Sequence, residues 1–184
     1  MQIYKANKSN KGCALSVSFN SKEGALFIQL IKQVSYDESK HLGSFSGGDK
    51  LTIKSNVTEV GNFIDVLTRN VEYSTVHKSA DATTQIWLAP YIVDIEGVKT
   101  QKGFGLRVSK KTNDGQELKF LMPLNFGEAA ALKVYFDFFL RHVFSAEYAE
   151  SKKQFKEKQE RSQSLSKPSK VVEKSEGNED DSIE

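Results

Sequence analysis

The sequence predicts an α+β fold with antiparallel sheets and helices gathered on one side of them. Three observations predict it. Many segments alternate apolar and polar residues with the period of two that is typical of a strand. Two segments, residues 56–70 and 125–144, instead keep the 3.6-residue spacing of a helix. The order along the chain is four strands, a helix, four strands and a helix, and such separate runs favour an α+β architecture.

The segments before the first helix show two kinds of strand pattern. Residues 13–19 alternate cleanly, which predicts a half-buried strand. Residues 25–36 are apolar on both faces, so we expect this strand to be covered on both sides. Residues 37–49 are polar and contain glycine, which predicts a loop with room for a short central strand. Alternation returns in residues 50–54.

The first helix has a clear start signal. Asn56 followed three residues later by Glu59 is a capping box, in which each side chain accepts a hydrogen bond from the other residue's backbone N–H. Apolar residues then keep helical spacing up to Arg69 and Asn70. Gly61 weakens a helix by up to ~1 kcal/mol relative to Ala, so we expect close packing at that point.

Four further strands are expected between the two helices. Their residues alternate or are rich in β-branched and aromatic side chains. The turn TNDG, residues 112–115, predicts a tight hairpin because Asn, Asp and Gly tolerate positive φ. The four strands are expected at residues 71–78, 84–95, 102–111 and 116–123.

The last helix, residues 125–144, is predicted to serve both a core and an oligomer. Asn125 and Glu128 repeat the capping box, and six apolar residues from Leu132 to Val143 form one helical face. One packed sheet covers a stripe of roughly 100°, so a second apolar line needs another surface, which we expect a second subunit to supply. The alternative is a fully buried helix in a monomer. The predicted oligomer interface consists of Ala131, Val134 and Phe138.

Charge divides the chain near residue 145. Residues 1–144 hold eighteen Lys or Arg against fourteen Asp or Glu, whereas residues 145–184 hold eight against ten. We predict a basic domain over 1–144 and a charged, largely disordered tail over 145–184. Residues 146–161 are able to extend the helix but are polar all round, and residues 162–184 lack the apolar side chains needed for folding. The last nine residues carry five acids, and a basic body with an acidic terminus is typical of a protein that binds a polyanion and also mimics one.

The cysteine content and the apolar segments of the sequence indicate the cellular setting. Cys13 is the only cysteine, so an intrachain disulfide is impossible and a reducing compartment is expected. No window approaches the roughly 18 apolar residues of a membrane span, and Met1 leads into polar residues rather than an apolar signal segment. We expect a soluble, intracellular protein with no membrane partner.

No constellation of residues predicts an enzyme, a metal site or a cofactor. His41, His77 and His142 are far from one another in the sequence, and none of them lies at metal-ligand spacing from the single cysteine. Gly103 and Gly105 form a lone GxG inside a strand pattern, where a bend in the strand is a better explanation than a phosphate cradle. We therefore expect a non-enzymatic protein.

One region instead carries chemistry suited to single-stranded nucleic acid, which needs aromatic faces for bases and cations for phosphates. Strand alternation puts Gln85, Trp87 and Tyr91 on one face. In the neighbouring strands Arg107 and Lys119 point outward in the same way. The alternative interpretation is that Trp87 and Tyr91 pack at the rim of the core and that the cations form an ordinary solvated face.

The strand at residues 71–78 adds a third group. Alternation puts Tyr73, Thr75 and His77 on one of its faces. We expect Tyr73 to stack a base, whereas a histidine such as His77 is more often a hydrogen-bonded strand residue than a base contact.

Four segments, in this order and with this spacing, resemble the Whirly family: residues 10–19 (NKGCALSVSF), 50–67, 73–79 and 103–144. The resemblance covers roughly residues 8–144. It implies a single-stranded DNA-binding protein with little sequence preference. It also implies a fold, shared with the transcription coactivator positive cofactor four and with trypanosome mitochondrial RNA-binding proteins, of two four-stranded antiparallel sheets and two helices. Four protomers would join through the helices, with DNA across and between neighbouring sheets.

The family's signature is a lysine, glycine, lysine, alanine, alanine, leucine run in the first strand. Residues 11–15 match its first lysine, its glycine and its final alanine and leucine, but its second lysine is missing. Because the resemblance ties this run to nucleic-acid contact and to higher assembly of tetramers, assembly beyond four protomers is in doubt. Lys8 and Lys11 are expected to supply the charge instead.

Two departures from the plant members concern origin and partners. The sequence lacks their organelle transit peptide and has an acidic terminus, which suggests a bacterial or bacteriophage relative in the cytoplasm, with association to the nucleoid. Acidic tails on single-strand binders resemble those that recruit replication and recombination proteins or compete with DNA for the groove.

The sequence therefore predicts a homotetrameric, sequence-tolerant single-stranded DNA-binding protein that acts in replication, recombination or repair. The alternatives are an RNA-binding or annealing protein of the same fold, and a transcription regulator or scaffold that works through its tail. The expected nucleic-acid-binding residues are Lys8, Lys11, Gly12, Lys32, Tyr73, Trp87, Tyr91, Arg107 and Lys119.

Overall fold

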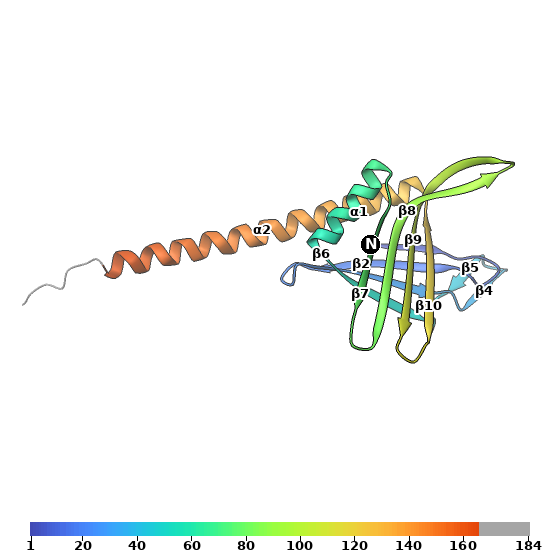
Figure 1. Ribbon diagram of the computed structural model, residues 1–184, viewed down its shortest axis with the longest axis horizontal. Coiled ribbons are helices and arrows are strands. Elements are labelled where there is room, and N and C mark those ends of the chain that lie inside the picture. The colour runs from blue at the N-terminus through green and yellow to red at the C-terminus, as the bar shows by residue number, and fades with distance from the viewer. Residues whose placement is uncertain (166–184) are drawn as a thin grey trace, which may run out of the picture. The chain divides into compact units, whose positions relative to one another are not determined.

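A computed structural model of the chain describes residues 1–165 (Figure 1). The chain divides into two units, Met1–Ala146 and Glu147–Glu184. The acidic terminus and the disorder predicted for residues 166–184 lie outside the described residues. The helix that begins in the first unit continues to Leu165, so residues 162–165 are helical where disorder was predicted.

The first unit contains the two four-stranded antiparallel sheets that were expected. The first sheet has the strand order β1-β2-β3-β6 and the second has the order β10-β9-β8-β7. In Figure 1 the strands of the second sheet run across those of the first. The first sheet consists of β1 (Gln2–Lys5), β2 (Cys13–Asn20), β3 (Ala25–Lys32) and β6 (Lys50–Asn56), and the second of β7 (Tyr73–Lys78), β8 (Ala82–Ile95), β9 (Val98–Thr112) and β10 (Glu117–Leu124).

The fourth strand of the first sheet comes from an unexpected place. It is β1, at the amino terminus, where Ile3 is buried and pairs with Leu15 of β2. The loop between β3 and β6 instead contains a separate two-stranded hairpin of β4 (Ser35–Asp37) and β5 (Leu42–Ser44). A four-residue strand with one buried side chain leaves little periodic signal, which explains why the sequence did not show it.

The helix α1 (Val57–Arg69) follows β6 directly and begins as predicted. The Asn56 side chain accepts a hydrogen bond from the Glu59 N–H at 3.0 Å, and the Glu59 carboxylate accepts one from the Asn56 N–H. The helix ends at Asn70, whose φ of 60° closes the last turn in the left-handed conformation. The close packing expected at Gly61 is wrong, because a methyl group there would meet nothing within 4 Å.

The helix α2 (Phe126–Leu165) contributes several large apolar side chains to the core. Its predicted capping box is present, with the Asn125 side chain accepting from the Glu128 N–H at 2.8 Å. The predicted inward face packs between the sheets and α1, and Phe63 of α1 lies 5.8 Å from Phe136 between ring centroids. The side chains of this face are buried at Leu132, Phe136, Phe139 and Val143 and partly buried at Tyr135 and Leu140.

Candidate nucleic-acid interface

The second sheet has one face turned away from the core, and strand register decides which side chains lie on it. Trp87 of β8 pairs with Ser74 of β7 and with Arg107 of β9, and Arg107 pairs with Leu121 of β10. These four residues therefore form one row across the sheet. The next row consists of Val76, Gln85, Ser109 and Lys119.

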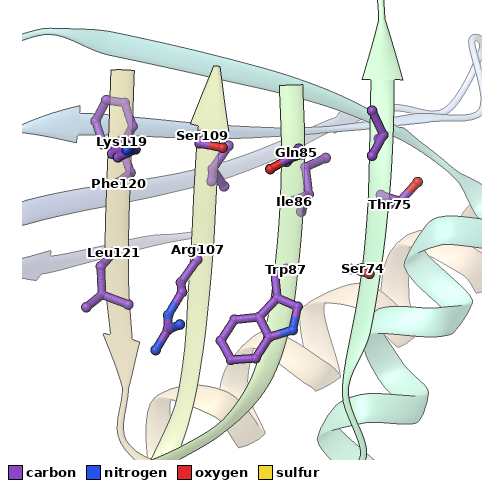
Figure 2. Close-up of a pocket in the computed structure, with 12 residues that line it drawn as sticks. Ser74, Thr75, Gln85, Ile86, Trp87, Arg107, Ser109, Lys119, Phe120 and Leu121 are labelled. Carbon is purple, nitrogen blue, oxygen red and sulfur yellow. The ribbon is translucent and has the colours of Figure 1, made fainter. Parts of the chain in front are cut away.

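The two rows line a concave surface of about 680 Å³, which we call the aromatic groove (Figure 2). At its centre the Arg107 guanidinium carbon lies 4.4 Å from the centroid of the Trp87 ring, a cation–π contact between direct cross-strand neighbours. Gln85 and Ser109 lie beside this pair in Figure 2. The lining therefore combines a flat apolar ring, an amide and a hydroxyl, all from adjacent strands.

Tyr91 lies on the same face as Trp87, further along β8. Its ring covers Gly105 of β9, since a methyl group on Gly105 would lie 3.6 Å from Tyr91 Cδ2. The strand is irregular immediately after Tyr91, and Gly103 opposite it has a φ of 140°. A side chain at Gly103 would lie 1.9 Å from the Leu124 carbonyl oxygen, so the glycines of the GxG allow a bend and a close approach of strands.

A second concave surface adjoins the first. It holds about 460 Å³ and shares Lys119, Phe120 and Leu121 of β10 with the aromatic groove. Because four of its side chains are lysines, we call it the lysine groove. Its other lining residues are Lys5, Asn7, Asn10, Lys11, Gly12, Cys13, Lys32 and Pro123.

Three of the four lysines of this groove, Lys5, Lys32 and Lys119, already have carboxylate partners. Lys32 lies 3.1 Å from Asp49 and 5.7 Å from the centroid of the Phe120 ring. Lys119 lies 2.9 Å from Glu117. Exposed pairs of this kind contribute roughly 0 to 1 kcal/mol, so a phosphate can replace the carboxylates at little cost.

The loop between β1 and β2 forms one wall of the lysine groove. Buried Gln33 holds it, donating to the Asn7 carbonyl at 2.9 Å while its own oxygen accepts from the Asn7 N–H at 2.9 Å. Gly12 is required there for space, since a methyl group would lie 2.1 Å from the Gln33 oxygen. Lys11 is exposed at the end of this loop, and its N–H donates to the Asn7 side chain.

Cys13, which follows Gly12 in this run, points into the core. Its side chain is 4% exposed, and burial raises the pKa of the thiol to about 11. A lysine in this orientation would be buried without a partner. The positive charge of the groove therefore comes from lysines on neighbouring elements.

Three of the predicted nucleic-acid-binding residues, Tyr73, Tyr91 and Lys8, line neither groove. Tyr73 faces the core side of the second sheet, where its ring centroid is 5.8 Å from that of Phe63 on α1. His77 shares that face and lies 2.6 Å from the Glu59 carboxylate. The structure thus places Tyr73, predicted to stack a base, on the opposite face from Trp87. Lys8 is exposed in the β1–β2 loop but does not line either groove.

Sequence reasoning missed several groove residues. Lys5 belongs to the unexpected strand β1, and its ammonium group lies 2.6 Å from Glu128 at the start of α2. Ser74 and Ser109 carried no signal beyond strand alternation, because serine is common on any solvated strand face. Alternation shows which residues of one strand share a face, but it does not relate the faces of two strands. Placing Tyr73 and Trp87 on opposite faces requires the register between their strands.

The second apolar line of α2 is exposed in the single chain. Val134 is 67% exposed and Phe138 is 55% exposed, and Ala131 is exposed on the same side of the helix. Phe138 contacts Phe19 with 5.8 Å between ring centroids. This arrangement does not match a helix buried fully within one chain.

Within residues 1–165, no cluster of His, Cys, Asp or Glu has the arrangement of a metal site. In the same part of the chain, none of the helices is both long enough and apolar enough to span a membrane.

The fold is similar to that of several solved structures. The plant transcriptional regulator PBF-2 matches with a TM-score of 0.56 and 15% identity, over 81% of this chain and 92% of that one. WHY1 from Arabidopsis thaliana matches with a TM-score of 0.58 and 15% identity, over 84% and 90%. MRP1/MRP2 from Trypanosoma brucei matches with a TM-score of 0.54 and 11% identity, over 80% and 95%. No protein-family model and no curated protein matches the sequence. These likenesses confirm the Whirly-like α+β fold.

Proposed function

We propose that this protein binds single-stranded nucleic acid, with DNA as its main ligand and little preference for base sequence. The observation that carries the proposal is the junction of the two grooves at Lys119–Leu121. One groove offers a flat ring to bases and the other offers lysines to phosphates. Single-strand binders combine these two features.

The arrangement favours unpaired over paired strands. Bases of a duplex are stacked on each other and their faces are not accessible to Trp87 or Tyr91. An open strand can place a base on an aromatic ring for roughly 1 to 3 kcal/mol per base. The amide of Gln85 and the hydroxyl of Ser109 can bond to the edges of any base, which is consistent with sequence tolerance.

The test is binding of fluorescein-labelled single-stranded DNA to the full chain, followed by anisotropy at rising salt. We expect tight binding at low salt that weakens steeply, because phosphate contacts release counterions. The same sequence as a duplex should bind more weakly. Absence of binding at low salt, or an affinity indifferent to salt, would contradict the proposal.

The alternative ligand within the same class is RNA. The fold is similar to that of MRP1/MRP2, and the polar side chains that line the grooves can accept a ribose as well as a deoxyribose strand. Competition between DNA and RNA strands of matched sequence decides between them. We expect DNA to compete at least as well as RNA. A strong preference for RNA would show that the protein binds or anneals RNA instead.

We further propose that the protein is a homotetramer that joins through α2. The support is the exposed line Ala131, Val134 and Phe138, which would be covered in an assembly. Light scattering after size exclusion should give four times the mass of one chain. Val134→Glu with Phe138→Glu should give smaller species, whereas a monomeric wild-type protein would contradict the assembly.

The cellular role that we propose is non-enzymatic and lies in replication, recombination or repair, in the cytoplasm of a bacterium or of a phage-infected cell. The acidic residues at the end of the sequence are proposed to bind replication or recombination proteins. The description of PBF-2 as a transcriptional regulator supports a second candidate, regulation of transcription. Truncation after Phe144 separates these roles, since a DNA binder keeps its affinity whereas a scaffold that acts through its tail loses its function.

A further inference from the structure

Arg107 differs in its surroundings from three of the four lysines of the lysine groove. Lys5, Lys32 and Lys119 each lie within 3.1 Å of a carboxylate. Arg107 is exposed and, among the residues whose side chains the structure describes, has no ion-pair partner; its contact is with Trp87. An unpaired guanidinium on a face proposed to bind nucleic acid suggests that Arg107 contacts a phosphate, and the sequence alone predicts that role.

The geometry points to another role. Arg107 and Trp87 are direct cross-strand neighbours, and the guanidinium carbon lies 4.4 Å from the ring centroid. At that distance a flat guanidinium covers one face of the indole. Figure 2 shows the two side chains on adjacent strands, with the Trp87 ring reaching across toward the strand of Arg107. A guanidinium stacked in this way keeps its N–H groups in its own plane, so the contact is compatible with a phosphate ligand as well, and an experiment has to separate the two roles.

We propose that Arg107 is a positioning residue, which holds the indole of Trp87 in the orientation that receives a base. Trp87 has a serine on its other side across the sheet, Ser74, which is too small to fix the ring. Without Arg107 the indole is free to adopt other rotamers. Binding of a base must then fix one of them, and the lost rotamer freedom lowers the affinity. Preorganisation of this kind raises affinity without adding a contact to the ligand. The proposal rests on the proposed function, because it assigns a role within the same site.

Salt dependence separates positioning from phosphate contact. Each phosphate contact contributes about −0.7 to the slope of log affinity against log salt for a single strand. A phosphate ligand replaced by glutamine therefore makes the slope less steep by about 0.7. Removal of a positioning residue lowers affinity by a similar factor at every salt concentration and leaves the slope unchanged.

The experiment uses the full chain with Arg107→Gln, Arg107→Lys and the control Lys119→Gln, each titrated with oligothymidine at rising salt. We expect Arg107→Gln to weaken binding about 2- to 5-fold at every salt concentration, which is the range of an exposed cation–π contact. Arg107→Lys should weaken binding nearly as much, because an ammonium is not planar. Lys119→Gln should reduce the slope. A reduced slope for Arg107→Gln, or full retention of affinity by Arg107→Lys, would overturn the proposal.

A second readout needs no ligand. Trp87 is the only tryptophan in the chain, so its fluorescence reports on this site alone. We expect Arg107→Gln to make Trp87 more accessible to the quencher acrylamide, and Lys119→Gln to leave quenching unchanged. Equal quenching of wild type and Arg107→Gln would contradict positioning even if nucleic-acid binding were strong. Increased quenching without any binding would instead leave positioning intact and remove the proposed function.

Discussion

The aromatic groove and the lysine groove meet at one strand but are built in different ways. The aromatic groove comes from four consecutive strands, β7 to β10, whose outward side chains follow from alternation and register. The lysine groove combines β1, the loop after it, β3 and β10, which are far apart in the sequence. One sheet face is therefore enough to form the proposed base-binding surface, whereas the proposed phosphate-binding surface depends on contact between the two sheets.

The largest expected effect is on the aromatic groove. Trp87→Ala removes the central ring and should weaken single-strand binding by about 5- to 150-fold, which corresponds to roughly 1 to 3 kcal/mol for one stacked base. The loss should be equal at low and high salt, because no charge is removed. Anisotropy titrations measure it, and light scattering checks that the oligomer is intact. Unchanged affinity would remove Trp87 from the site.

The matching change in the lysine groove is the triple variant Lys11→Gln, Lys32→Gln and Lys119→Gln. Removing three phosphate ligands of a single strand should make the salt slope less steep by about 2. Affinity should fall most at low salt, and the difference from wild type should shrink as salt rises. A uniform loss at every salt concentration would show that the lysines do not contact phosphates and would erase the contrast between the grooves.

A smaller effect is expected from Cys13, which lines the lysine groove but points inward. Since burial raises the thiol pKa to about 11, the thiol is neutral below that pH and thiolate forms only as the pH approaches it. Iodoacetamide at neutral pH should label the folded protein much more slowly than the protein in denaturant, as followed by mass spectrometry. Rapid labelling of the folded chain would place the thiol in the groove instead.

The smallest effect is expected from Tyr73→Phe. The ring of Tyr73 packs against Phe63 on the core side of the sheet, and phenylalanine keeps that contact. Binding should match wild type within error in the same titration. Tyr91→Ala is the comparison variant, because Tyr91 lies on the open face and its removal should weaken binding. A loss for Tyr73→Phe that equals the loss for Tyr91→Ala would show that the two faces have been assigned the wrong roles.

The predictable parts of the fold were those with a local cause. The capping boxes at Asn56 and Asn125 are formed by residues three apart, and both occur in the structure as the sequence indicated. The inward face of α2 and the outward position of Trp87 likewise follow from periodicity within one element. These features need no knowledge of distant residues.

The parts that failed depend on contacts across the chain. Strand β1 is defined by its pairing with β2, and Tyr73 lies inward because β7 pairs with β8 in a register that puts it beside Leu88. The prediction for Gly61 failed for the same reason, because packing at a helical glycine depends on distant residues and a methyl group there would meet nothing within 4 Å. The lysine groove, with Lys5 and the loop held by Gln33, could not have been assembled from the sequence for this reason.

The most direct test of the central claim is photo-crosslinking of the full chain to single-stranded DNA that contains 5-iodouracil, with the crosslinked peptides identified by mass spectrometry. We predict crosslinks at Trp87 and Tyr91 on the open face of the second sheet, which disappear when competitor single strands are added. Crosslinks confined to residues outside both grooves, with Trp87 and Tyr91 unmodified, would contradict the claim.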